Sequence, residues 1–316
     1  MQELPLAEIT VNEKYRLSFH RPLGPLLASI QEIGQVTPVL CRSGKNPELF
    51  SGFMRVEALS KLKRKRVSAM VFSGEDLSEL AAFKISFFEN ASGRGLNLIE
   101  QSMAVNALKG FGLDAKKIAQ LFFLKTGLPG GFAAVESLAA LAGLEEEWKK
   151  FLVEKQTGLR LASELARISA QDRGSIKFLP ALRATASQFR EALEMSLEIS
   201  RRERTGFAEV MKMVGAAAIL SRRLPGSRKL ELLLDALRQL RHPALSRLQT
   251  RHRKLCAELH IPAQARLDPA DYFEGPEYLL QLKVDQSTAA QGIFSRLKSA
   301  ASSEQWQKLF QLDDED

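Results

Sequence analysis

The chain has 316 residues, of which 45% are hydrophobic and 26% charged, and a formal net charge of +8. This composition indicates a globular protein with room for two or three domains. No apolar run approaches the roughly 18–20 residues of a membrane span, and Met1 to Thr10 lacks the basic start and apolar middle of a signal peptide. We therefore expect a cytoplasmic protein with no membrane partner. Its two cysteines, Cys41 and Cys256, are too far apart and too few for a disulfide framework.

The basic charge is concentrated in the middle of the chain. Residues 151–254 carry 21 Lys and Arg against 10 Asp and Glu, whereas residues 255–316 carry 5 against 11. A basic centre is typical of a segment that meets a polyanion. A basic helical surface without a ligand is the alternative.

Residues 1–72 have the pattern of a small α/β unit. We expect an extended segment at Leu6–Val11, a helix at Pro25–Ile33 ended by Gly34, strands at Thr37–Cys41, Glu48–Ser51 and Val67–Phe72, and a helix that follows the run Ser51–Arg55 and continues through Lys61. The run Ser51-Gly52-Phe53-Met54-Arg55 joins a strand to a helix through a glycine. Such a junction is a common phosphate site, because free backbone N–H groups and the helix dipole favour an anion.

The stretch from Phe87 to Gln101 places an acid, an amide and an arginine in a predicted turn between two helices. Glu89 and Asn90 follow an apolar helix, and Arg94 lies between two glycines. Asn97 and Glu100 have the spacing of a capping box, which predicts a helix start at Leu98. The acid and the amide can hold a hydrated cation, and the arginine can bind a phosphate. An ordinary helix connection with surface polar groups is the alternative.

Three motifs in this order resemble those of the ParB partition proteins, whose N-terminal domain shares its fold with sulfiredoxin and with a free-serine kinase. The motifs are IQEIGQVTPVL, SGFMRVEAL and FFENASGRGLNLIEQ. The resemblance runs from about Leu6 to about Ser169. In that family the pocket binds CTP with Mg²⁺. The resemblance implies that Thr37 lies in the pocket wall, that Gly52 and Arg55 hold phosphates, and that Glu89 and Asn90 approach the metal and the triphosphate.

Four positions depart from the family's pattern, one of which is Glu57, which stands where the family has a later arginine. Phe53 stands where the family usually has a glutamate associated with hydrolysis, and Met54 stands where it has the first of two arginines. The arginine of the third motif has moved on by one residue, to Arg94. Phe53, Met54 and Arg94 belong to the expected cofactor site, and Glu89 is the candidate catalytic residue. We expect nucleotide binding with slow or absent hydrolysis.

From Leu98 onward the sequence is helical, and GLDAKKIAQLF resembles the first helix of a helix-turn-helix. The candidate recognition segment, Gly130–Leu138, is apolar and offers no arginine to a base, which favours core packing over base readout. Contacts to the DNA backbone are expected instead. The residues expected to make them are Lys116, Lys117, Lys125, Arg160, Arg167 and Arg173.

Residues 206–261 are basic helices that either contact DNA or bridge domains. Beyond Pro262, a strand at Tyr278–Val284 and a helix at Thr288–Ala300 form a small α/β unit, with Trp306, Leu309 and Phe310 on its apolar side. A unit this short has a small core, so we expect it to pair with a second copy.

The expected fold class is α+β, with a ParB/sulfiredoxin-like α/β N-terminal domain, an all-helical helix-turn-helix middle and a small α/β dimerisation unit. The expected domains are residues 1–97, 98–205, 206–261 and 262–316. The expected function is a homodimeric, CTP-gated DNA clamp in chromosome or plasmid partition, associated with the nucleoid and with double-stranded DNA, and with a ParA-like ATPase as a further candidate partner. The alternatives are a DNA-binding regulator that has lost nucleotide use, and a small-molecule kinase with Glu89 as general base.

Overall fold

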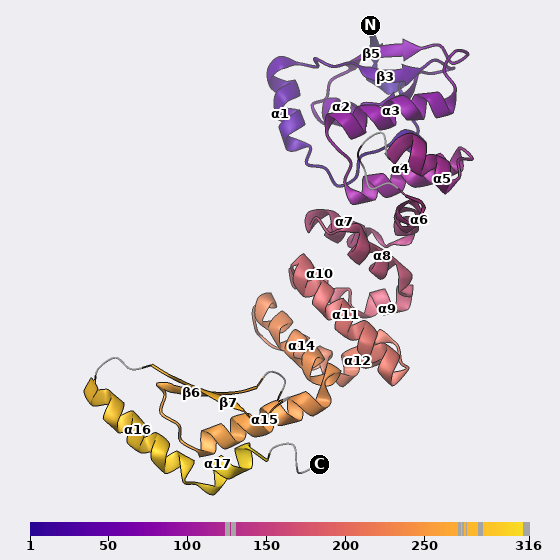
Figure 1. Ribbon diagram of the computed structural model, residues 1–316. Helices are drawn as coiled ribbons and strands as arrows, with labels where there is room; N and C mark the ends of the chain where they lie inside the picture. Colours follow the sequence, from indigo (N-terminus) through magenta and orange to yellow (C-terminus); the bar gives the residue numbers. More distant parts are fainter. Residues whose placement is uncertain are drawn as a thin grey trace. The chain divides into compact units, whose positions relative to one another are not determined.

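The computed structural model describes residues 1–123, 127, 131–270, 273, 275, 277–283 and 287–311 (Figure 1). The chain divides into two compact units, Met1–Pro180 and Ala181–Asp316. The first combines a five-stranded sheet with helices and the second is mainly helical with a two-stranded sheet. The expected α+β class is confirmed. Among the described residues, no helix combines the length and apolar character that a membrane span requires.

The first unit begins with a mixed five-stranded sheet in the order β1-β5-β3-β4-β2. Its strands are β1 (Gln2–Pro5), β2 (Thr10–Val11), β3 (Val39–Arg42), β4 (Glu48–Ser51) and β5 (Arg66–Phe72). Strands β3 and β5 are parallel, as are β2 and β4, and the other pairs are antiparallel. Val39 and Cys41 are fully buried and alternate with the less buried Leu40, so one face of β3 forms core.

Helices α2 (Phe53–Lys61) and α3 (Glu79–Gly93) lie on the same side of the sheet (Figure 1). Helix α1 (Gly24–Ile33) packs against α2. Phe83 and Phe87 of α3 are fully buried and supply much of this core. This core therefore lies between the sheet and the helices α2 and α3, close to the point where β4 leads into α2.

Helix α3 is longer than the sequence predicted. Glu89 and Asn90 lie within the helix, and Arg94 is its C-cap, so the expected turn around Glu89 and Asn90 is wrong. The side-chain amide of Asn90 donates to the Ser86 carbonyl at 2.8 Å, which satisfies a helical backbone group without interrupting the helix. The helix presents Glu89, Asn90 and Arg94 from a fixed backbone.

The rest of the first unit is helical. Its helices are α4 (Leu98–Gly110), α5 (Ala115–Ile118), a π-helical turn (Ala119–Phe123), α6 (Phe132–Ala140), α7 (Glu146–Glu154), α8 (Leu159–Arg167), α9 (Ala170–Ser175) and α10 (Phe178–Ala181). The predicted capping box of α4 is confirmed: Asn97 accepts from the Glu100 N–H at 3.0 Å, and Glu100 accepts from the Asn97 N–H at 2.9 Å.

The second unit contains two longer helices that run in the same direction, α11 (Ala186–Glu203) and α14 (Gly226–Arg241). Arg238 pairs with Glu191 at 2.7 Å and Arg241 with Glu198 at 2.5 Å, which sets their register. Between them in the chain lie α12 (Phe207–Met213) and α13 (Ala216–Ser221).

A small core closes the second unit. Its elements are α15 (Pro243–Glu258), β6 (Ala265–Pro269), β7 (Tyr278–Leu282), α16 (Ser287–Ala301) and α17 (Glu304–Leu309). Leu255 and Leu259 pack here with Leu267 and Leu309. Helix α15, which the sequence division placed in the connector, thus contributes to the same core as the C-terminal elements. The domain boundaries at 97, 205 and 261 stay predictions.

Gly52 is the N-cap of α2 and has a φ of 100°. A Cβ at this position would lie 2.8 Å from Cγ1 and 3.2 Å from Cα of Val39. Only glycine adopts this φ at low cost and permits so close an approach to β3.

We predict that Gly52→Ala lowers the free energy of unfolding by about 1–3 kcal/mol, from backbone strain and the clash with Val39. Urea denaturation followed by circular dichroism measures the loss. Gly158→Ala is the matched control, because Gly158 has an ordinary φ of −74° and open space around its Cα. Equal denaturation midpoints for the two variants would contradict this account of Gly52.

Candidate functional site

A cavity of about 410 Å³ lies where the start of α2 faces the end of α3. Thirteen residues line it, and eight of them are the residues that the sequence predicted for the cofactor site: Thr37, Gly52, Phe53, Met54, Arg55, Glu89, Asn90 and Arg94. Three motifs that are far apart in the chain thus meet at one cavity. Their role in ligand binding stays a prediction.

Arg55 and Glu89 form an ion pair across this cavity. Nη2 of Arg55 lies 3.1 Å from Oε1 of Glu89, and Nη1 donates to the Thr37 carbonyl at 3.2 Å. Glu89 also accepts a hydrogen bond from the hydroxyl of Ser51, the last residue of β4. The side chain of Arg55 is 16% exposed and that of Glu89 38% exposed, so both groups are held by protein and still reach solvent. Arginine and carboxylate from distant motifs converge here.

Arg94 lies in the cavity wall with its guanidinium already engaged. Its Nε donates to Asn90 Oδ1 at 2.8 Å, its Nη1 lies 3.0 Å from both carboxylate oxygens of Glu100, and its Nη2 donates to the Leu17 carbonyl. Arg94 therefore orients Asn90 and fixes the wall. Because all three nitrogens of this guanidinium already donate to protein acceptors, Arg94 is better suited to supporting the wall than to binding a phosphate directly.

Glu100 is fully buried behind this wall. Besides Arg94 it binds Arg21, with Nε and Nη2 at 3.0 and 2.5 Å, and it accepts from the Phe19 N–H at 3.1 Å. Burial opposes ionisation of this carboxyl, but hydrogen bonds from Arg21 and the Asn97 N–H and the charge of Arg94 outweigh it, so the pKa of Glu100 lies below its ordinary value. The carboxylate stays charged at neutral pH.

Sequence reasoning missed part of the wall and its support. The additional lining residues are Leu17, Ser18, Leu26, Ser51 and Gly93. Ser51 was recognisable in principle, since it ends the strand just before Gly52. Arg21 carries no local signal, because its partner Glu100 lies 79 residues further along the chain.

Phe53 is buried at the cavity, and its ring lies 5.2 Å from the guanidinium carbon of Arg16. The position that departs from the family's glutamate is thus filled by an aromatic ring under a cation. Among the residues that line this cavity, the carboxylate is that of Glu89.

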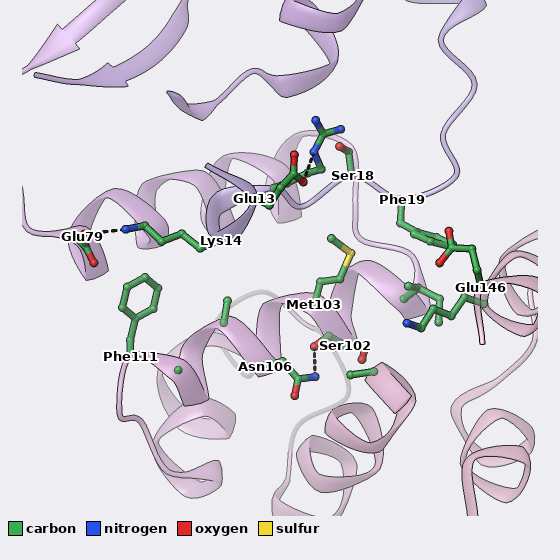
Figure 2. Close-up of a pocket in the computed structure, with 16 residues that line it drawn as sticks. Glu13, Lys14, Ser18, Phe19, Glu79, Ser102, Met103, Asn106, Phe111 and Glu146 are labelled. Atoms are coloured by element: carbon green, nitrogen blue, oxygen red, sulfur yellow. Dashed lines mark hydrogen bonds and ion pairs between the residues drawn. The ribbon is translucent and has the colours of Figure 1, made fainter. Parts of the chain in front are cut away.

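A larger cavity of about 740 Å³ adjoins the first, with Ser18 lining both. Figure 2 shows Met103 and Asn106 on α4 below the segment that carries Glu13, Lys14 and Ser18. Four of its charged side chains pair with one another, Lys14 with Glu79 at 2.7 Å and Arg16 with Glu13 at 2.8 Å. No glycine-led helix start opens onto it among the residues that line it. We therefore place the candidate site in the smaller cavity.

A magnesium ion fits the smaller cavity only in part through protein ligands. Glu89 offers carboxylate oxygens, whereas the Asn90 amide already donates to Ser86 and accepts from Arg94. The described residues contain no group of three or more His, Cys, Asp or Glu side chains placed to hold a metal. Magnesium is commonly held by one or two carboxylates together with substrate phosphates and water. Glu89 with a polyphosphate satisfies that requirement.

The residues expected to contact DNA differ in their exposure to solvent. Lys116, Lys117, Arg160 and Arg167 are exposed, although Lys117 lies 3.8 Å from Asp114 and Arg160 lies 3.2 Å from Glu164. Lys125 lies outside the described residues.

Arg173 is buried, and its guanidinium binds Glu145 at 2.8 and 3.0 Å and the Ile168 carbonyl. The same bonds hold the pKa of Glu145 below its ordinary value. Arg173 is therefore committed to the interior and is not carried forward as a DNA contact.

Helix α6 packs through its apolar face, as the sequence favoured. Val135 and Leu138 are fully buried, while Phe132 is 65% exposed and Glu136 pairs with Lys109 at 2.9 Å. The helix carries no lysine or arginine. Its side chains provide no cation for base readout.

Comparison with known proteins gives structural neighbours only. No protein-family model and no curated protein matches the chain. Chromosome-partitioning protein ParB from Caulobacter crescentus, C-terminally truncated and complexed to the centromeric parS site, matches with 20% identity over 61% of this chain and 99% of that chain, at a TM-score of 0.33. The same protein complexed with CTP-γ-S matches with 25% identity over 53% and 92%, at 0.27.

A Pnob8-like ParB-N domain matches with 15% identity over 61% of this chain and 91% of that chain, at a TM-score of 0.39. The chain is thus similar to ParB-type proteins, in line with its three motifs.

We predict that Glu100→Gln lowers the free energy of unfolding at pH 7 by about 3–5 kcal/mol, because it leaves two partly buried arginines without a counter-charge. Since the folded-state pKa of Glu100 lies below its ordinary value of about 4.3, the stabilisation is complete above that value and is lost as pH falls through the lower folded-state pKa. Denaturation at several pH values measures both effects.

The control is Glu164→Gln, which removes an exposed pair with Arg160 and should cost about 0–1 kcal/mol. Equal losses for the two variants, or a loss for Glu100→Gln that does not shrink in acid, would count against the buried network.

Proposed function

We propose that the chain is a ParB-like DNA-binding protein whose N-terminal cavity binds a nucleoside triphosphate, with CTP as the expected nucleotide, and acts as a nucleotide-gated DNA clamp in chromosome or plasmid partition. The observation that carries the proposal is the convergence of Gly52, Arg55 and Glu89 on one cavity of about 410 Å³. A polyphosphate requires an arginine, a close backbone approach and a carboxylate-held cation. The cavity supplies the arginine, the glycine and the carboxylate that would hold such a cation.

The ion pair between Arg55 and Glu89 suggests how the site responds to its ligand. A phosphate group competes with Glu89 for the guanidinium of Arg55, because both are anions that accept from the same Nη2. Once Arg55 turns to the phosphate, Glu89 is released toward a cation. Magnesium, when bound, would neutralise phosphate charge beside Glu89. Phosphate binding and cation binding thereby reinforce each other.

The start of α2 provides the second phosphate contact. The first N–H groups of a helix lack partners within the helix, and Gly52 leaves this end without a side chain at its N-cap. A phosphate seated there comes within the same cavity as Arg55. Thr37 closes the cavity from the strand side.

DNA binding is assigned to the phosphate backbone. The exposed Lys116, Lys117, Arg160 and Arg167 supply cations, whereas α6 supplies none. Such contacts position DNA without reading its sequence. Helix α6 is assigned no role in reading bases.

The C-terminal elements support a homodimer. Leu279 is 60% exposed and Phe294 is 56% exposed, on a two-stranded sheet and the helix that follows it. A two-stranded sheet is marginal on its own in water, and a second copy would cover these side chains. A dimer joined at this end, on nucleoid DNA and with a ParA-like ATPase as partner, completes the clamp hypothesis.

The two rival functions fit less well. A regulator without nucleotide use is favoured by Phe53 beneath Arg16, because that position has no carboxylate. A small-molecule kinase requires Glu89 as a free general base, yet Glu89 is paired with Arg55 and bonded to Ser51. An arginine that can exchange its partner Glu89 for a phosphate favours nucleotide binding over either.

We predict that, among ATP, GTP, CTP and UTP titrated with Mg²⁺ by calorimetry, wild type binds CTP selectively. Arg55→Ala should weaken this affinity about 10- to 100-fold, as expected for the loss of a charged hydrogen bond of about 1.5–3 kcal/mol. Arg64→Ala, which removes an exposed arginine from the same unit, should bind like wild type. Phosphorylation of a small alcohol would establish the kinase, and absence of all nucleotide binding would establish the regulator.

We predict that wild type releases phosphate from CTP too slowly for multiple turnovers, with or without DNA, because Phe53 replaces the carboxylate that the family associates with hydrolysis. A continuous phosphate-release assay with CTP in excess over protein measures this. DNA-stimulated release of many equivalents per chain would overturn the expectation.

A further inference from the structure

Several segments of the second unit are free of acidic residues, among them residues 236–257. Residues 181–190 and 210–230 also contain no Asp or Glu, although acids are frequent on either side of them. These last two segments contain seven cations: Arg183, Arg190, Lys212, Arg222, Arg223, Arg228 and Lys229. These two segments therefore carry part of the excess of basic charge in the middle of the chain.

The two segments meet at one end of the α11 and α14 pair. A Cβ built on Gly226, the first residue of α14, would lie 3.4 Å from the Leu182 carbonyl oxygen. Leu182 is adjacent to Arg183 and precedes α11, while Arg222 and Arg223 lie between α13 and α14. Because α11 and α14 run in the same direction, both segments lead into the same end of the pair. Arg183, Arg222 and Arg223 form what we call the corner patch.

The arginines of the corner patch differ from Arg228 and Arg238 of the same unit in lacking protein partners. Arg183, Arg222 and Arg223 are all exposed, and within the described part of the chain none of their side chains makes a hydrogen bond or an ion pair. By contrast, Arg228 pairs with Glu231 at 2.7 Å and Arg238 with Glu191 at 2.7 Å. These three unpaired arginines therefore contribute no stabilising contact within the chain.

From this charge and placement we propose that the corner patch binds the phosphate backbone of duplex DNA, as a second contact separate from that of the first unit. The inference rests on the proposed function, because it assigns a second surface to the same partner. Guanidinium groups match phosphate oxygens in a bidentate fork and are weakly hydrated, so unpaired exposed arginines suit this role better than lysines. The contact is independent of base sequence.

The test is the salt dependence of binding of the full chain to a fluorescent duplex of arbitrary sequence. Each phosphate contact adds about 0.9 to the slope of log K against log salt concentration. Arg222→Ala/Arg223→Ala should therefore lower the magnitude of the slope by about 2. Arg238→Ala, a single exposed but paired arginine of the same unit, should leave the slope unchanged. Circular dichroism checks that both variants are folded.

The outcomes separate this inference from the proposed function. A wild type that binds DNA, with the same slope in both variants, overturns the corner patch and leaves the DNA-binding proposal intact. The corner patch is likewise overturned if Arg238→Ala lowers the slope as much per arginine as the double variant does. A wild type that binds no duplex DNA overturns both proposals.

Discussion

Glu100 holds three separate segments of the first unit against one another. Its carboxylate binds Arg21 from the N-terminal loop and Arg94 from the end of α3, and it caps the start of α4 through the Asn97 N–H. Burial alone would favour the neutral acid, and the two arginines reverse that preference. Arg94 in turn holds Asn90, so the wall of the candidate site depends on a charge that never reaches the cavity.

Paired charges also shape the cavity itself. Arg55 is paired with Glu89, so the site presents no strong unbalanced charge before a ligand arrives. A single carboxylate or phosphate gains little by displacing Glu89. A polyphosphate with its cation satisfies both partners at once, which favours that ligand class over simple anions. Specificity for a polyphosphate would thus arise because Arg55 and Glu89 exchange each other for the ligand and its cation, and not because the cavity is an open, positively charged pocket.

Much of the fold and of the candidate site follows from local signals in the sequence. The capping box at Asn97, the strand at Glu48–Ser51 and the glycine at the start of α2 are encoded within a few residues and lie where they were predicted. The extent of α3 was not predictable in this way, because Asn90 continues the helix by bonding back to Ser86. Arg173 and Arg21 were misjudged or missed, since the acids that bind them come from distant elements. Which side chains pair across a long stretch of sequence is decided by the tertiary structure, and local sequence signals do not reveal it.

The central claim is that Arg55 and Glu89 act on the same bound polyphosphate. A double-mutant cycle with Arg55→Ala, Glu89→Gln and the double variant, measured as CTP affinity at saturating Mg²⁺, tests it most directly. We expect a coupling energy of at least about 1 kcal/mol, because residues that share a ligand are not additive. Additive losses within about 0.3 kcal/mol, the behaviour of independent sites, would show that the two residues do not meet on one ligand.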